Sequence, residues 1–245
     1  MSKYVVFDLE TVPDYTVWTP PPPKKNADPD ASPFPPVYAH RPVVIGFLSC
    51  ELIGAGLSIN RIACAPDTAD EALLLSGWSD YLDHHHPTLV SWNGRTFDLP
   101  VLMHRMLKHG VSAPWYYQNR DTRYRYSENG HLDVMDALSD YGACKFNSLD
   151  AMAHLVGMPG KLDVSGSKVE AMMAEGKLTE VETYCLTDVV QTAALWLRYR
   201  LLAGHATRAA FQAHAQALLA ACDADPRLAP LTAKIDRAAF ALTAA

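Results

Sequence analysis

The 245-residue chain has no long apolar run and no excess of positive charge. No stretch approaches the roughly 20 consecutive apolar residues that a membrane-spanning helix needs, so no membrane anchor is expected. Lysine and arginine number 21 against 27 aspartates and glutamates, which gives a net charge of −6. The charge therefore does not indicate a protein that coats nucleic acid through bulk electrostatics, and any contact with a polyanion must be local.

Cysteine is scarce and unpatterned. The five cysteines are Cys50, Cys64, Cys144, Cys185 and Cys222, and no two of them form a Cys-x-x-Cys pair. An odd number at scattered positions argues against a disulfide framework and against a structural zinc site. We expect reduced, buried thiols. Because a strand is expected from residue 3, we expect no cleavable leader and a cytoplasmic location.

Apolar residues make up 49% of the chain, enough to bury one substantial core. Proline is concentrated over residues 12–41, where it removes backbone donors and fixes φ, so we expect a long loop insertion there. β-branched enrichment predicts strands over 3–12, 42–52, 56–66 and 88–94, with a short element at 131–138. Helical spacing predicts helices over 67–85, 97–109, 147–156, 167–175 and 178–203.

The opening stretch KYVVFDLETV is an apolar strand that ends in two acidic residues. Successive strand side chains point to opposite faces, so Asp8 and Glu10 share one face while Leu9 points to the other. Two carboxylates held side by side repel each other, and a buried strand has no need of them. Taken alone, Glu10 is also explained as the entry to a solvated loop.

Three further polar residues follow apolar patterns later in the chain. In SWNGRTFDLP, Asp98 opens a helix, where capping alone would explain an aspartate. In YCLTDVV, Tyr184 and Asp188 are four residues apart on a helix and project from the same face. A phenol and a carboxylate on an otherwise apolar face require a polar partner.

Four carboxylates in one place would destabilise one another unless cations neutralise them. Oxygen ligands of this kind select hard ions, so Mg²⁺ or Mn²⁺ is expected. Two such ions, roughly 4 Å apart, stabilise the attacking and leaving oxygens of an in-line phosphoryl displacement. The pattern therefore predicts a two-metal site that acts on a phosphodiester.

The segments FDLET, NGRTFD and YCLTD resemble the three motifs of the DEDD superfamily of 3′–5′ exonucleases, in the branch with a Tyr-x-x-x-Asp third motif (DEDDy). The segments HLDVMDAL and SLDAMAHLVGMPGKLD more specifically resemble the predicted exonucleases similar to the proofreading domain of family-B DNA polymerases. The resemblance implies an α/β, RNase H-like fold, in which helices flank a mixed five-stranded sheet whose first three strands are antiparallel. It covers residues 3 to about 204, so we expect an exonuclease domain over 1–204 and an Ala-rich helical extension over 205–245.

Residue by residue, the resemblance implies a role for five side chains. Asp8 would bridge two Mg²⁺ or Mn²⁺ ions, and Glu10 and Asp188 would complete the shell of the first ion. Asp98 would hold the second ion, through water. Tyr184 would orient the attacking water.

Substrate contacts are implied at neighbouring positions. Leu9, Thr11, Asn93 and Phe97 lie within the motifs and would contact the 3′-terminal nucleotide, although Phe97 is equally well explained as a core residue. Lys161 of MPGKLD would reach the substrate backbone, whereas the glycine beside it is explained by a turn. Tyrosines and arginines alternate over residues 115–130, which would suit base stacking or, with ordinary charges, a strand or loop edge.

The sequence thus predicts a metal-dependent 3′–5′ exonuclease that shortens single-stranded nucleic acid, with DNA favoured, to nucleoside 5′-monophosphates. Its partner would be the 3′ end of a single strand, no membrane is expected, and the identity of any protein partner is left open. Two alternatives stay open, namely a catalytically silent RNase H-like domain that binds nucleic acid and an RNase H-like endonuclease.

Overall fold

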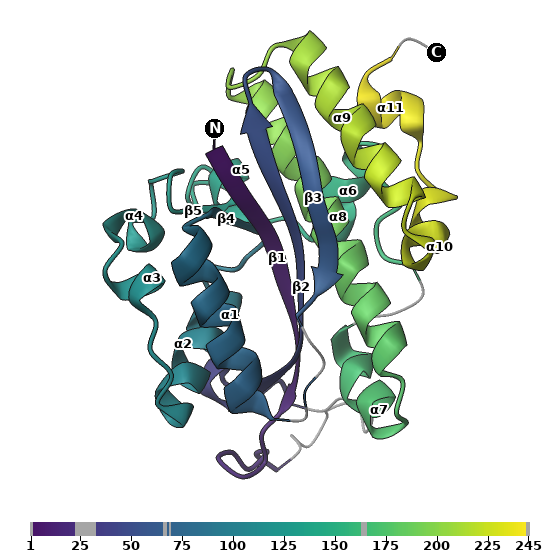
Figure 1. Ribbon diagram of the computed structural model, residues 1–245. Coiled ribbons are helices and arrows are strands. Elements are labelled where there is room, and N and C mark those ends of the chain that lie inside the picture. The colour runs from purple at the N-terminus through teal and green to yellow at the C-terminus, as the bar shows by residue number, and fades with distance from the viewer. Residues whose placement is uncertain (1, 23–32, 66–67, 69, 163–165, 244–245) are drawn as a thin grey trace.

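The computed structural model describes residues 2–22, 33–65, 68, 70–162 and 166–243 (Figure 1). Its strands are β1 Ser2–Pro13, β2 His40–Ile53, β3 Gly56–Cys64, β4 Thr88–Ser91 and β5 His131–Asp133. Its α-helices are α1 Glu71–His85, α2 Asp98–His109, α3 Pro114–Tyr117, α4 Arg120–Arg123, α5 Val134–Leu138, α6 Leu149–Leu155, α7 Val169–Ala174, α8 Leu178–Leu202, α9 Arg208–Asp223, α10 Ala229–Thr232 and α11 Arg237–Ala241. Short 3₁₀ helices are η1 Val37–Ala39, η2 Gly166–Lys168 and η3 Pro226–Leu228.

The strands form one sheet in the order β3-β2-β1-β4-β5. β1, β2 and β3 are antiparallel neighbours, and β4 and β5 run parallel to β1. This confirms the predicted RNase H-like arrangement of a mixed five-stranded sheet with an antiparallel start. β1 is much longer than β4 and pairs with it only over Tyr4–Val6, so the second half of β1 has a strand neighbour on one side alone.

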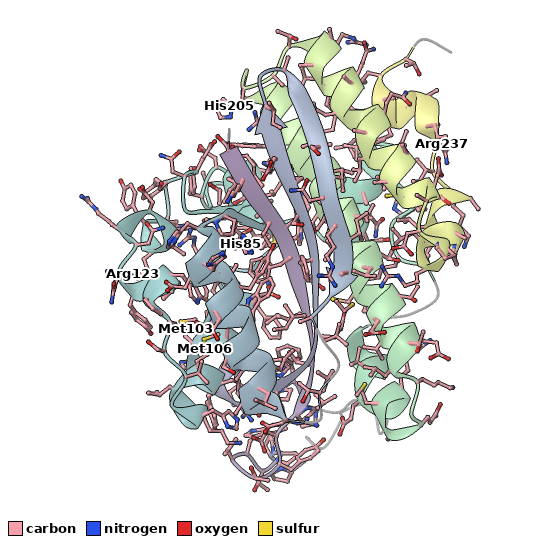
Figure 2. All side chains as sticks on the ribbon, in the orientation of Figure 1. His85, Met103, Met106, Arg123, His205 and Arg237 are labelled. Carbon is pink, nitrogen blue, oxygen red and sulfur yellow. The ribbon has the colours of Figure 1, made fainter. Side chains whose placement is uncertain are left out.

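Helices cover both faces of the sheet (Figure 1). Alternate β1 residues such as Val5 and Phe7 pack under α1, α2 and α3, where Met103 and Met106 of α2 also lie (Figure 2). Val6 faces the opposite layer, which is built on α8 and α9. Asp8 and Glu10 have the same strand parity as Val6, so the sheet directs them toward α8.

The C-terminal helices share the core of the sheet's α8 face. Phe211 of α9 and Phe240 of α11 are fully buried in the same cluster as Trp196 of α8. The division of the chain at residue 204 stays a prediction. Within the part of the chain that the structure describes, no helix is both long enough and apolar enough to cross a bilayer.

The predicted loop over 12–41 is too long at both ends. Val12 and Pro13 continue β1 and pair with Arg41 and His40, which begin β2. Pro13 is tolerated in β1 because β4 ends earlier, so no strand on that side of β1 needs a hydrogen bond from its backbone nitrogen. Residues 23–32 of the predicted loop lie outside the described residues.

The predicted strand or loop edge over 115–130 is wrong in part, because α3 and α4 occupy residues 115–117 and 120–123 while the remaining residues form turns and loop. Pro114 begins α3, and the Asn119 side chain caps α4 by accepting from the backbone N–H of Asp121. Arg120 and Arg123 lie over the rings of Tyr124 and Tyr117. Figure 2 shows Arg123 projecting outward at the edge of the molecule.

A buried ion-pair network anchors the chain just after β1. Arg105 of α2 is 1% exposed and pairs with Asp14 at 2.7 Å and with Glu71 of α1 at 2.5 Å. Lys108 adds a second pair to Asp14 at 2.6 Å. The end of β1 is therefore fixed to both helices on this side of the sheet.

Candidate active site

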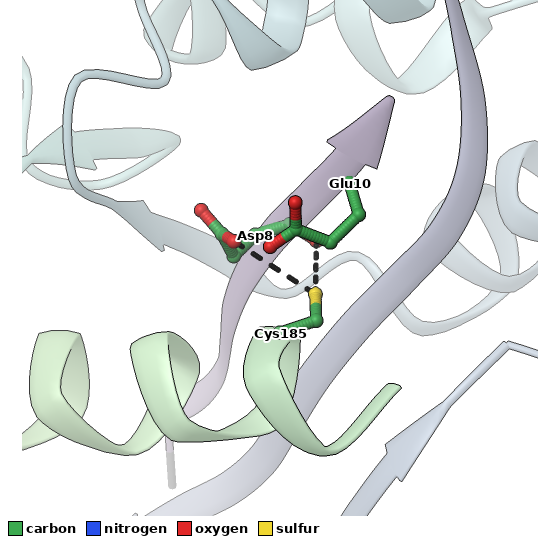
Figure 3. A group of neighbouring side chains, drawn as sticks. All are labelled: Asp8, Glu10 and Cys185. Carbon is green, nitrogen blue, oxygen red and sulfur yellow. Dashed lines mark hydrogen bonds between the residues drawn. The ribbon is translucent and has the colours of Figure 1, made fainter. Parts of the chain in front are cut away.

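Asp8 and Glu10 lie on the second half of β1, beyond its pairing with β4. Glu10 is only 6% exposed, and a register irregularity follows it before Thr11. Figure 3 shows both carboxylates on one side of the strand, facing α8. The shared face predicted from the strand period is thus confirmed, and the alternative of a solvated loop entry at Glu10 is wrong.

Asp98 is the first residue of α2 and is 3% exposed. Its Oδ1 accepts a 3.1 Å hydrogen bond from the backbone N–H of Leu9. The N-cap position belongs to Phe97, which makes no capping bond with its side chain, so capping does not explain this aspartate. Asp98 instead binds the edge of β1 that β4 leaves open.

Gly94 allows this approach. A Cβ atom on Gly94 would lie 2.3 Å from Oγ of Ser91 and 3.4 Å from Oδ2 of Asp98. No side chain fits in that gap. The glycine of the NGRTFD segment therefore lets the turn between β4 and α2 close against the carboxylate.

α8 contributes Tyr184, Cys185 and Asp188 to the same region. The Tyr184 hydroxyl lies close enough to the Asp188 carboxylate for each group to shift the pKa of the other, which confirms the shared helix face predicted from their spacing. Asp188 also accepts a 3.4 Å bond from Nε2 of Gln191. The buried thiol of Cys185 lies 3.5 Å from the backbone oxygen of Asp8 and 3.8 Å from its Oδ2.

Another glycine brings α8 close to the sheet. Gly46 of β2 is the register partner of Asp8, and a Cβ atom there would lie 2.6 Å from Sγ of Cys185. α8 can therefore pack this closely against β1 and β2 only because residue 46 has no side chain. The sequence stretch VVIGFL gave no signal of this role.

Burial dominates the electrostatics of the four carboxylates. It raises the pKa of Asp98 to about 7 and that of Asp188 to about 6. The pKa values of Asp8 and Glu10 are raised well above their ordinary values, first by burial and then by the neighbouring carboxylates. Burial and the same carboxylates also raise the pKa of Tyr184, so its hydroxyl keeps its proton.

The oxygen and sulfur atoms of this site could serve as ligands of a divalent cation. The Glu10 carboxylate is buried yet has no hydrogen-bond donor or cationic side chain as a partner among the described residues. The only donor to the carboxylate of Asp8 within those residues is the weak S–H of Cys185. Asp8, Glu10 and Cys185 place one ligand atom each within 4.8 Å of one another. Buried carboxylates without counter-charges are stable only if protonated or if they hold a cation.

The residues predicted to contact the substrate range from buried to exposed. Leu9 packs its side chain into the core under α1 and α2, so any substrate contact there is a backbone contact. Asn93 adopts a left-handed φ of 64°, and its N–H donates to Oδ1 of Asp133 at 3.0 Å. Lys161 is exposed, and its charge lowers the pKa of Asp188 relative to burial alone.

Thr11 and Phe97 meet at a histidine that the sequence did not single out. Oγ1 of Thr11 lies 2.8 Å from Nδ1 of His40, and the imidazole packs edge-on against the ring of Phe97 with centroids 4.8 Å apart. Phe34, which is 75% exposed, contacts both rings. Phe97 therefore belongs to an aromatic group that includes the exposed Phe34 and packs against the core cluster under α1 and α2.

A second set of polar contacts fixes the turn between β4 and α2. Asp133 of β5 accepts from the backbone N–H groups of Asn93 and Arg95, both at 3.0 Å. The Arg95 guanidinium in turn contacts Nδ1 of His131 at 3.2 Å. His131 and Asp133 therefore have a structural role in holding this turn.

Comparison with known proteins gives a family match over most of the chain. Residues 32–232 match the family model described as "Predicted 3'-5' exonuclease related to the exonuclease domain of PolB". The match includes Asp98, Tyr184 and Asp188 and begins after Asp8 and Glu10. None of the curated protein sequences matches the chain with significant similarity.

A solved DNA polymerase structure shares the fold. The family B DNA polymerase of Pyrobaculum calidifontis aligns over 95% of the chain with a TM-score of 0.51 and 16% identity. The chain spans only 27% of that polymerase. Escherichia coli exonuclease I in complex with a dT13 oligonucleotide aligns over 78% of this chain and 43% of its own, with a TM-score of 0.41 and 12% identity. The second likeness is too loose to support a conclusion about this chain.

Proposed function

Because this chain belongs to the family of predicted 3′–5′ exonucleases related to the exonuclease domain of PolB, we propose that it hydrolyses single-stranded nucleic acid from the 3′ end. Each cycle adds water across the terminal phosphodiester, leaving a 3′-hydroxyl on the shortened strand and releasing a nucleoside 5′-monophosphate. DNA is the favoured substrate because the family is related to a DNA polymerase domain.

One observation carries the proposal. Four carboxylates, of which Glu10 and Asp98 are buried and Asp8 and Asp188 half-buried, converge from three separate parts of the chain, and Glu10 has no protein partner among the described residues. Such a cluster opposes folding and repels phosphates, so a domain that only binds nucleic acid gains nothing from it. Cations held by these oxygens would remove both disadvantages.

The carboxylates would divide the binding of two Mg²⁺ or Mn²⁺ ions. Asp8 would bridge the two ions, with Glu10 and Asp188 on the first. Asp98 would hold the second through water, with Oδ2 as the available oxygen because Oδ1 accepts from the N–H of Leu9. When bound, ions of this kind activate water and stabilise the charge that develops on the phosphate.

Tyr184 would orient the attacking water. Its hydroxyl stays protonated because its pKa is raised, and its closeness to Asp188 places it next to the carboxylates. A phenol in this state can donate or accept a hydrogen bond without adding negative charge.

The remaining contacts would hold the 3′-terminal nucleotide. Phe97, the residue before Asp98, packs its ring against the buried imidazole of His40, which Thr11 fixes. Asn93 lies on the same turn as Phe97, and Lys161 offers a cation for the strand's phosphates. Stacking and single cationic contacts of this kind do not depend on base sequence.

A panel of 5′-labelled oligonucleotides tests the proposal. DNA and RNA single strands incubated with Mn²⁺ should give ladders that shorten from the 3′ end, and chelation or Asp8→Ala should abolish them. Absence of a ladder on every substrate, or an unchanged ladder with Asp8→Ala, would overturn the proposed activity.

The same panel separates the two alternatives. A circular single strand or one with a blocked 3′ end should resist cleavage by an exonuclease, whereas an RNase H-like endonuclease would cut it internally. A silent binding domain would bind the oligonucleotide without cleaving it. Calorimetry with Mn²⁺ adds a second test, because heat that disappears in Asp8→Ala or Asp188→Ala favours the enzyme.

A further inference from the structure

The thiol of Cys185 lies directly beneath the carboxylates of Asp8 and Glu10 (Figure 3). It is fully buried, 3.5 Å from the backbone oxygen of Asp8 and 3.8 Å from its Oδ2. The three side chains place one ligand atom each within 4.8 Å of one another. A soft sulfur ligand is thus part of a site whose other ligands are hard oxygens.

The geometry of this group suits a small tetrahedral cation. A Zn²⁺ ion binds sulfur at about 2.3 Å and carboxylate oxygen at about 2.1 Å, which places the two ligand atoms about 3.6 Å apart at a tetrahedral angle. Sγ of Cys185 and Oδ2 of Asp8 are 3.8 Å apart. Little movement of these two side chains is therefore needed to accommodate the ion.

Glu10 supplies the independent reason to expect a cation here. Its carboxylate is 6% exposed, it faces the same space as the thiol, and no donor or cationic group among the described residues satisfies it. The thiol alone would be an ordinary buried cysteine that donates to Asp8. The unsatisfied carboxylate beside it makes the group a ligand set.

We propose that Asp8, Glu10 and Cys185 form an inhibitory site for a soft divalent cation such as Zn²⁺ or Cd²⁺. The ion would be drawn toward α8 by the sulfur and would occupy the two carboxylates that the exonuclease reaction needs. Binding releases the thiol proton to solvent. The inhibitory consequence rests on the proposed function, whereas the binding of the ion does not.

Cd²⁺ titration of the metal-free protein tests the binding. The parent should carry Cys144→Ser, because Cys144 is exposed and would bind the ion nonspecifically. We expect one equivalent of Cd²⁺ to produce the ultraviolet charge-transfer band of a Cd–thiolate bond. Adding Cys185→Ser should abolish the band, and adding Cys222→Ser, at a buried thiol of α9, should leave it unchanged.

Two further measurements test the site even if Cys185→Ser fails to fold. Asp8→Asn and Glu10→Gln retain the thiol, and each should weaken Cd²⁺ binding by about tenfold or more. Mn²⁺ in excess should displace Cd²⁺ and remove the band, because the two ions share the carboxylates. Calorimetry with Mn²⁺ checks that Cys185→Ser keeps a folded site.

The outcomes separate this inference from the proposed function. Absence of the band in the parent, or its persistence in Cys185→Ser, overturns the soft-metal site whether or not the protein is a nuclease. A band with no exonuclease activity would leave the ion site in place and overturn only the function. With both present, Zn²⁺ should inhibit cleavage in Mn²⁺, and about tenfold more Zn²⁺ should be needed in Cys185→Ser.

Discussion

The backbone N–H of Leu9 donates a 3.1 Å hydrogen bond to Oδ1 of Asp98. This bond joins the strand that carries two site carboxylates to the helix that carries the third. It occurs where β4 has ended, so the aspartate takes the place of a strand neighbour. One carboxylate oxygen thus has a structural partner while the other stays available.

Asp98→Asn and Asp98→Ala should separate these two roles. Asparagine keeps an oxygen for the Leu9 N–H and removes a buried charge, so the metal-free protein should be at least as stable as the parent. Alanine leaves a buried N–H unsatisfied and should lower the free energy of unfolding by about 1–3 kcal/mol. Urea unfolding in a chelator measures both. Equal losses of stability in the two variants would show that the Leu9–Asp98 hydrogen bond has no structural role. Cleavage should fail in both variants.

Tyr184→Phe should slow cleavage without abolishing the ion site. The ring remains, but the hydroxyl that would orient water is lost, so we expect kcat to fall about 10²-fold. Calorimetry should show Mn²⁺ binding within a few-fold of the parent. An unchanged kcat would remove the tyrosine from the mechanism while leaving the carboxylates in place.

The metal-free protein should lose stability as the pH rises. The ordinary pKa of aspartate is 3.8, and burial raises the folded-state values of Asp98 to about 7 and Asp188 to about 6. Both groups therefore bind protons more tightly when folded, a contribution fully present below pH 3.8 and lost as the pH passes 6 to 7. The free energy of unfolding should fall by a few kcal/mol across this window.

Added Mn²⁺ should offset that fall, because an ion that binds only the folded state stabilises it by mass action. Thermal unfolding at a series of pH values, in chelator and in Mn²⁺, makes the comparison. A metal-free protein whose stability rises from pH 4 to pH 7 would contradict the raised pKa values.

Lys161→Gln should weaken substrate binding more than it slows chemistry. Loss of one phosphate contact should reduce the slope of log affinity against log salt by about 0.7 for a single strand. The matched control is Lys234→Gln, an exposed lysine between α10 and α11. Fluorescence anisotropy with labelled dT oligonucleotides over a salt series measures the slope. Identical slopes in the two variants would exclude a phosphate contact at Lys161.

Gly46→Ala should disrupt the packing of α8 on the sheet. The new Cβ atom would lie 2.6 Å from Sγ of Cys185, and overpacking of this kind costs about 1–3 kcal/mol. Adding Cys185→Ala removes the obstructing sulfur and should recover part of the loss, a coupling that a double-mutant cycle measures. Additive effects of the two changes would mean that the glycine matters for another reason.

The sequence predicted pairs of site residues better than it predicted the complete site. Strand parity placed Asp8 and Glu10 together, and helix spacing placed Tyr184 and Asp188 together, because each pair depends on local geometry alone. Convergence of the separate segments followed only from the family resemblance. Asp98 was open to a capping explanation until the structure showed its bond to Leu9.

His40 and Cys185 were missed for a physical reason. His40 contacts Thr11 and Phe97 because β2 pairs with the end of β1, and the proline-rich stretch, predicted to be entirely loop, hid that pairing. Cys185 had a detectable signal, since it precedes Asp188 by one helical turn and follows Tyr184. Its closeness to Asp8 depends on the missing side chain of Gly46, which only tertiary packing reveals.

The site carboxylates are distributed along the chain so that β1 carries the first two and α8 the last. A ribosome making this chain must therefore synthesise every strand of the sheet before Asp188 exists, and the nascent chain cannot assemble the full set of ligands until then. The proposed hydrolytic capacity would thus arise only after the sheet has been made. In such a nuclease the order of the sequence itself would keep the unfinished domain inactive.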